Sequence, residues 1–148
     1  MSLKARITED MKAAMRAGEK DRLSCIRMLQ AGIQQREVDE RVTLGDAEVI
    51  AVIDKMIRQR KESVVQFQAG NRADLVAKES AEIALLSAYL PARLGDAELD
   101  AMIKDAIAAT SAASMKDMGK VMGLLKPKVQ GRADMGALSA RIKSALGG

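Results

Sequence analysis

The chain has 148 residues, a hydrophobic content of 48% and a net charge of +4. It has no histidine, one cysteine and only two aromatic residues, which excludes a histidine base, a Cys/His zinc site and an intramolecular disulfide. No apolar run approaches the roughly 20 residues that span a membrane, and residues 1–18 lack the apolar core of a signal peptide. These features predict a cytoplasmic protein that does not enter a membrane.

The apolar side chains are mainly Leu, Ile, Val, Ala and Met, and the clustered aromatic and β-branched residues of strands are missing. We therefore predict an all-α fold. Glycines mark the expected ends of helices, because glycine readily adopts the left-handed conformation that closes a helix. They are Gly18, Gly45, Gly70 and Gly95.

Residues 1–91 are predicted to form an antiparallel helical bundle. Its helices are expected over residues 2–17, 19–38, 47–69 and 73–90, with Ser2 and Asp46 as N-caps. Pro91 should stop the last of them, because proline disfavours helix at the residue before it and lacks an amide donor. Short turns between helices favour antiparallel packing.

A smaller domain of three short helices is predicted for residues 96–148, after a boundary at residues 91–95. Asp96, Ser114 and Asp134 are expected to begin these helices. Asp117 lies three residues after Ser114, the spacing of a capping box with an acidic partner.

Two charged residues interrupt apolar helical stripes in the predicted bundle. Arg60 and Glu79 both face the seam of the helical hairpin that turns near Gly70. Because an unpaired buried ion costs several kcal/mol, we expect Arg60 or Lys61 to pair with Glu79 or Glu82. Arg60→Ala should then cost about 1–3 kcal/mol.

The positive charge is concentrated near the C-terminus. Residues 116–148 carry two acidic and seven basic side chains, a net charge of +5. This asymmetry favours an anionic partner, although a solvated basic surface kept for solubility would look the same. The basic residues are Lys116, Lys120, Lys126, Lys128, Arg132, Arg141 and Lys143.

Gly119 and Gly123 lie four apart, on one face of a predicted helix. Their missing side chains suit close packing of a neighbouring helix or, alternatively, contact with a ribose–phosphate backbone. Pro127 should end or bend this helix. Because both aromatic residues, Phe67 and Tyr89, lie outside this region, the region lacks the stacking groups that read single-stranded bases.

Residues 114–134 read SMKDMGKVMGLLKPKVQGRAD, which resembles the signature of the GatB/YqeY family. The signature contains Gly119, Gly123, Pro127, Gly131 and Asp134. Further similarity covers residues 26–29 with Ile33 and Glu37, residues 58–63, residues 70–75 with Lys78, Glu79 and Glu82, and residues 89–91. The resemblance thus spans nearly the whole chain and points to a free-standing YqeY-like protein.

The resemblance implies a fold like the tail of the B subunit of tRNA-dependent amidotransferase, which contacts the tRNA body away from the chemistry. The catalytic cradle of that enzyme lies in a separate domain. The sequence therefore predicts no catalytic residue, metal site or cofactor. Three hypotheses remain open: a binding module for tRNA or another structured RNA, a protein-interaction adaptor in translation, or an accessory to a carbon–nitrogen ligase that uses glutamine as amide donor.

Overall fold

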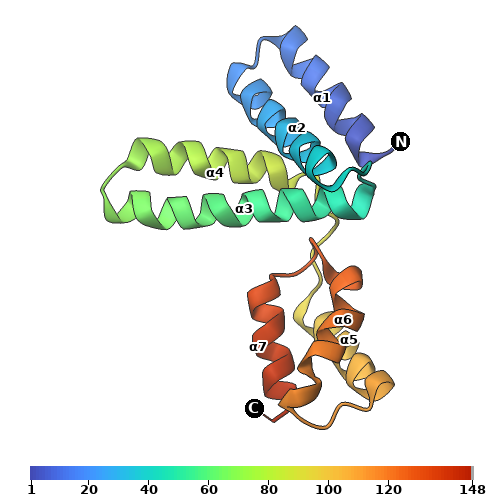
Figure 1. Cartoon of the computed structure of the whole chain (residues 1–148). Helices are drawn as coiled ribbons and strands as arrows, with labels where there is room; N and C mark the ends of the chain where they lie inside the picture. The colour runs from blue at the N-terminus through green and yellow to red at the C-terminus, as the bar shows by residue number, and fades with distance from the viewer. Residues whose placement is uncertain (148) are drawn as a thin grey trace. The chain divides into compact units, whose positions relative to one another are not determined.

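The computed structural model describes residues 1–147 as helices joined by short loops (Figure 1). None of these residues forms a strand, so the predicted all-α fold class is confirmed. The backbone contacts divide the chain into two compact units, Met1–Leu90 and Pro91–Gly148.

The first unit consists of two antiparallel helical hairpins (Figure 1). One pairs α1 (Leu3–Ala17) with α2 (Lys20–Glu40), and the other pairs α3 (Asp46–Ala69) with α4 (Ala73–Ser87). The hairpins cross where α3 meets α1 and α2, and where α4 meets α2. Their shared core buries mostly aliphatic side chains, among them Ile7, Ala14, Cys25, Leu29, Val49, Ile53 and Leu86.

The outer part of the α3–α4 hairpin extends past α2 as a two-helix arm (Figure 1). No residue from 61 to 78 is buried, because only two helices are available there to cover each other. The arm is therefore held mainly by the α3–α4 seam, and the core of the unit lies near the crossing.

Two of the predicted glycine stops begin helices instead of ending them. Gly18 does close α1 in the left-handed conformation, with φ 69°. Gly45 and Gly95, however, are the N-caps of α3 and α5 (Asp96–Thr110). At the start of α3 the Gly45 amide donates to the Glu48 carboxylate at 3.0 Å. This bond satisfies a helix-end amide that would otherwise have no partner.

Two predicted helix ends also move. Helix α2 runs on to Glu40, two residues beyond the prediction, and Arg41 then adopts the left-handed conformation. Helix α4 ends at Ser87, three residues earlier than predicted, since the chain turns before it reaches Pro91.

The second unit packs α5, α6 (Met118–Val129) and α7 (Met135–Ala145) against one another, with a short 3-10 turn, η1 (Met115–Asp117), leading into α6. Each helix contacts the other two around one aliphatic core. The core side chains are Leu99, Ile103, Ala106, Val121, Leu125, Val129, Leu138 and Ile142.

Side-chain caps begin two of the helical segments in this unit, η1 and α7. Ser114 accepts from the Lys116 amide, and Asp117 accepts from the Ala113 and Ser114 amides, as the capping-box spacing predicts. These backbone amides hold the pKa of Asp117 below its ordinary value. The Asp134 side chain likewise accepts from the Gly136 amide at 2.8 Å and begins α7.

Candidate nucleic-acid interface

Helix α6 carries on its solvent face a nearly bare strip, made of two glycines and one proline. Gly119, Gly123 and Pro127 follow one another at intervals of four residues, and all three are exposed. A Cβ atom added at either glycine would meet nothing within 4 Å. The opposite face of the helix holds the buried side chains, Val121, Leu125 and Val129.

This geometry decides two points that the motif left open. Close packing by a neighbouring helix does not explain Gly119 or Gly123 within the described residues, because their face is open. Pro127 does not end the helix where it stands, since α6 continues to Val129. Proline has no amide hydrogen, so α6 lacks the backbone bond that residue 127 would otherwise donate to the Gly123 carbonyl.

Three lysines surround the bare strip. At 100° per residue, Lys120 and Lys126 project from α6 on opposite sides of the strip. Lys116 lies about one turn before the strip begins. All three are exposed, and the ammonium of Lys120 lies 3.9 Å from Asp117 while its side chain stays 70% exposed. Lys116 and Lys126 form no ion pair with the described residues. The strip thus combines accessible backbone with positive charge.

The other two lysines of the basic segment lie apart from the strip. Lys128 lines a hollow of about 170 Å³ between α5 and α6, where Asp105 is also present. Lys143 is exposed on α7.

Arg132 and Arg141, two of the seven basic residues expected to meet an anionic partner such as RNA, form contacts within the unit. The Arg132 Nε donates to the Ala92 carbonyl at 3.0 Å, and its own carbonyl accepts from the Leu94 amide at 2.8 Å. Arg132 therefore ties the segment before α5 to the loop after α6. That loop turns at Gly131, which is buried and has φ 76°, a value that favours glycine.

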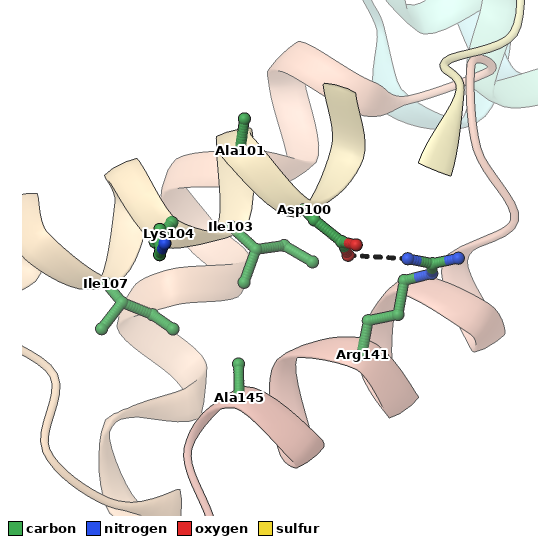
Figure 2. A pocket seen from close by; sticks show the side chains of 7 residues that line it. All are labelled: Asp100, Ala101, Ile103, Lys104, Ile107, Arg141 and Ala145. Carbon is green, nitrogen blue, oxygen red and sulfur yellow. Dashed lines mark hydrogen bonds and ion pairs between the residues drawn. The ribbon is translucent and has the colours of Figure 1, made fainter. Parts of the chain in front are cut away.

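Arg141 joins α7 to α5. Its guanidinium lies 2.6 Å from Asp100 and 2.7 Å from Asp96, and Figure 2 shows the contact with Asp100. Beside this pair lies a hollow of about 570 Å³ with an apolar floor, lined in part by Ile103 and Ile107 (Figure 2). Lys104 also lines it, so with Asp100 and Arg141 the hollow presents both signs of charge and no single electrostatic preference.

In the first unit Arg60 forms an ion pair with Glu82, one of the pairs predicted from the sequence. Its Nε lies 2.9 Å from the Glu82 carboxylate, and its Nη1 donates to the Met56 carbonyl at 3.2 Å. A third guanidinium contact reaches Met28 Sδ at 3.9 Å. Glu79 is half-buried on the same side of α4 and is not a partner of Arg60. The pair is structural, since its groups satisfy one another.

Cys25 lies next to this ion pair and is fully buried. Burial raises the pKa of its thiol, and the neighbouring Glu82 raises it further. A thiol in this setting is a poor nucleophile. Within residues 1–147 no three potential ligand side chains gather as a metal site, and no helix there is long and apolar enough to cross a membrane.

A family model described as "Yqey-like protein" matches residues 4–146. The chain belongs to the YqeY-like family. Its relatives include three fungal proteins, each named "Altered inheritance of mitochondria protein 41, mitochondrial". The protein from Pyrenophora tritici-repentis is 31% identical, over 96% of this chain and 80% of its own length. The protein from Eremothecium gossypii is 31% identical, over 96% of this chain and 79% of its own length. The protein from Lachancea thermotolerans is 35% identical, over 68% of this chain and 56% of its own length.

These names overturn the predicted cytoplasmic location, because the relatives of this YqeY-like chain are named as mitochondrial proteins. The criterion behind that prediction was the lack of an apolar leader segment. Mitochondrial targeting segments are amphipathic and rich in arginine, so the lack of an apolar run does not argue against mitochondria.

Several contacts that shape the YqeY-like fold carry no local sequence signal. Tyr89 donates to Asp10 at 2.6 Å, and the Arg6 guanidinium lies 4.9 Å from the centre of its ring. Lys4 pairs with Glu37 at 2.6 Å. Each joins residues more than 30 positions apart, so only the folded chain shows them.

Proposed function

We propose that the C-terminal unit of this YqeY-like protein binds the phosphate backbone of a structured RNA, with tRNA as the first candidate. The observation that carries the proposal is the bare strip Gly119–Gly123–Pro127 on the exposed face of α6, set among Lys116, Lys120 and Lys126. The absence of side chains at Gly119 and Gly123 lets a nucleic-acid backbone come close, and the lysines supply its counter-charge.

The chemistry of the unit favours shape over base sequence. Neither of the two aromatic side chains of the protein lies in it, so it has no platform for stacking unpaired bases. Lysine ammonium groups bind phosphates as point charges without reading base edges. The expected ligand is therefore a folded, largely base-paired RNA. Family resemblance to the amidotransferase tail supports tRNA among such RNAs.

The proposed role is binding without chemistry. The RNA-facing residues are lysines, glycines and one proline, none of which forms a nucleophile–base pair here. A link to tRNA-dependent amidotransferase would then consist of holding or presenting tRNA, while the reaction takes place elsewhere.

The charge of the strip can be tested by tRNA binding to the full chain at low salt. Replacing Lys116, Lys120 and Lys126 together by Ala should weaken binding at least tenfold and reduce the salt slope by about one unit per lost phosphate contact. The matched control removes three exposed lysines of the first unit that form no ion pairs in the described structure, Lys55, Lys61 and Lys78. It should bind nearly as tightly as the unmutated protein.

The bare backbone can be tested by Gly123→Gln. Nothing lies near this position, and glutamine forms helix better than glycine by roughly 0.5–1 kcal/mol, so the fold should be slightly stabilised. Binding of tRNA should nevertheless weaken about fivefold or more, because the new side chain blocks close approach. Unchanged binding by this variant would reject the close-approach argument. If the unmutated protein does not bind tRNA at low salt, the proposal as a whole is wrong.

A further inference from the structure

The outer face of α2 contains a shallow hollow of about 480 Å³ that the RNA-binding proposal does not use. One of its lining residues, Met28, also contacts the Arg60 guanidinium. Leu23, Met28 and Ala31 provide its apolar lining, and Lys20, Ser24 and Arg27 provide the polar remainder. The volume lies within the range of ligand-sized clefts, about 300–1,000 Å³, although this hollow is open along one side.

Exposed methionines make this region unusually apolar for a solvent face. Met28 is 48% exposed, and Met15 at the end of α1 is 52% exposed. The Arg27 guanidinium contacts Met15 Sδ at 3.8 Å, and Arg27 and Met28 both line the hollow. Methionine side chains are flexible and polarisable, and they adapt to the surface of a partner helix.

The charge of the hollow has one sign. Lys20 and Arg27 are the only ionisable groups that line it, and neither forms an ion pair with the described residues. Other cations of the same helix are paired: Arg22 with Glu19 and Arg36 with Glu40. An apolar hollow with two available cations complements an apolar surface that carries acidic groups.

We propose that this hollow docks an acidic amphipathic helix of a partner protein. From Lys20 to Ala31 the face covers about 16 Å, which matches roughly three turns of a docked helix. Lys20 and Arg27 are seven residues apart, about 10 Å along α2, so two carboxylates one heptad apart on the partner can meet both. The apolar residues between them would cover Leu23 and Met28.

An RNA would use this surface poorly. Phosphates would meet Lys20 and Arg27, but the Leu23 and Met28 side chains would gain no apolar cover from a ribose–phosphate backbone. The hollow also lies in the first unit, whereas the proposed RNA strip lies on α6 in the second. The two proposals can therefore fail separately.

The experiment measures binding of fluorescein-labelled 14-residue peptides to the full chain by fluorescence anisotropy. The probe is a designed helix with leucines at positions 4, 8 and 11. Glutamates flank these leucines, and two of the glutamates are seven residues apart. One control peptide replaces every glutamate by lysine, and a second has the same composition in scrambled order. The acidic amphipathic peptide should bind at least tenfold tighter than either control, and its binding should weaken as salt is raised.

Variants of the protein test whether the peptide binds at the hollow on α2. Arg27→Glu and Met28→Gln should each weaken binding about tenfold, while circular dichroism remains unchanged. The matched controls are Lys78→Glu and Val65→Thr, at an exposed cation and an exposed apolar residue of the α3–α4 arm. Both should bind the peptide normally.

Three results would overturn the proposal. The first is that the acidic peptide binds no tighter than its scrambled control. The second is that Arg27→Glu and Met28→Gln bind it as well as Lys78→Glu and Val65→Thr do. The third is that Arg27→Glu abolishes tRNA binding and leaves peptide binding intact, which would assign the hollow to nucleic acid.

Discussion

Replacing Arg60 by Ala should destabilise the first unit by about 3 kcal/mol. The Arg60 side chain is 9% exposed and that of Glu82 is 14% exposed, so the substitution leaves a nearly buried carboxylate without its cation. Breaking a buried pair in this way costs roughly 3–5 kcal/mol. We expect the lower end, since Glu82 keeps slight access to water. A cost of about 3 kcal/mol is also the upper end of the range expected from the sequence. The deep burial of the Arg60–Glu82 pair explains why the cost lies at that end.

The assay can follow the first unit alone. The protein has one tyrosine and no tryptophan, and Tyr89 is buried in the core of the first unit. Its near-ultraviolet circular dichroism during urea unfolding therefore reports that unit and not the second. The matched control is Lys61→Ala, at the exposed neighbouring position, which should change the free energy of unfolding by less than about 0.5 kcal/mol.

A double variant separates the charge from the packing. Arg60→Met combined with Glu82→Leu removes both ions and keeps most of the volume, so the free energy of unfolding should return to within about 1 kcal/mol of the unmutated protein. The prediction is wrong if Arg60→Ala costs no more than Lys61→Ala. It is also refuted if the double variant is as unstable as Arg60→Ala, because the loss would then come from shape and not from a stranded charge.

Two further predictions concern pH. Hydrogen bonds from Lys4 and the Leu44 amide hold the pKa of Glu37 below its ordinary 4.5, so its stabilisation is present above that pH and is lost as the pH falls below it. Glu37→Gln should therefore make Tm less dependent on pH on the acid side. Burial and the hydrogen bond to Asp10 raise the pKa of Tyr89 above its ordinary 10, so its contribution is complete below pH 10 and is lost as the pH rises further. Absorbance at 295 nm should show Tyr89 ionising only well above pH 10, and Tyr89→Phe should lower the free energy of unfolding at pH 7 by about 1 kcal/mol.

Much of the local structure could be predicted because it depends on neighbouring residues. The capping box of Ser114 and Asp117 and the cap at Asp134 are formed by side chains that lie two to four residues from their backbone partners. The Arg60–Glu82 pair was also predictable, since a tight turn near Gly70 brings the two helices together in a nearly fixed register.

The candidate RNA site was predictable only in part. Composition identified the basic segment and the glycines, but it treated seven cations as equivalent. In the folded chain Arg132 holds the Ala92 carbonyl, and Arg141 is shared by two aspartates of α5. A guanidinium finds such partners by tertiary packing, which brings together residues about 40 positions apart in the sequence.

The sequence by itself determined which segments are helical and where several helices begin, because helical periodicity and capping act within a few residues. Its family motif likewise identified the chain as YqeY-like, which the family model confirms. Only the tertiary structure decided that the Gly119–Gly123 face stays open and which cations are already paired. It also decided that Met28 borders a hollow instead of filling the core. These properties depend on which helix faces meet, and in this chain distant residues make that choice through the burial of a shared core.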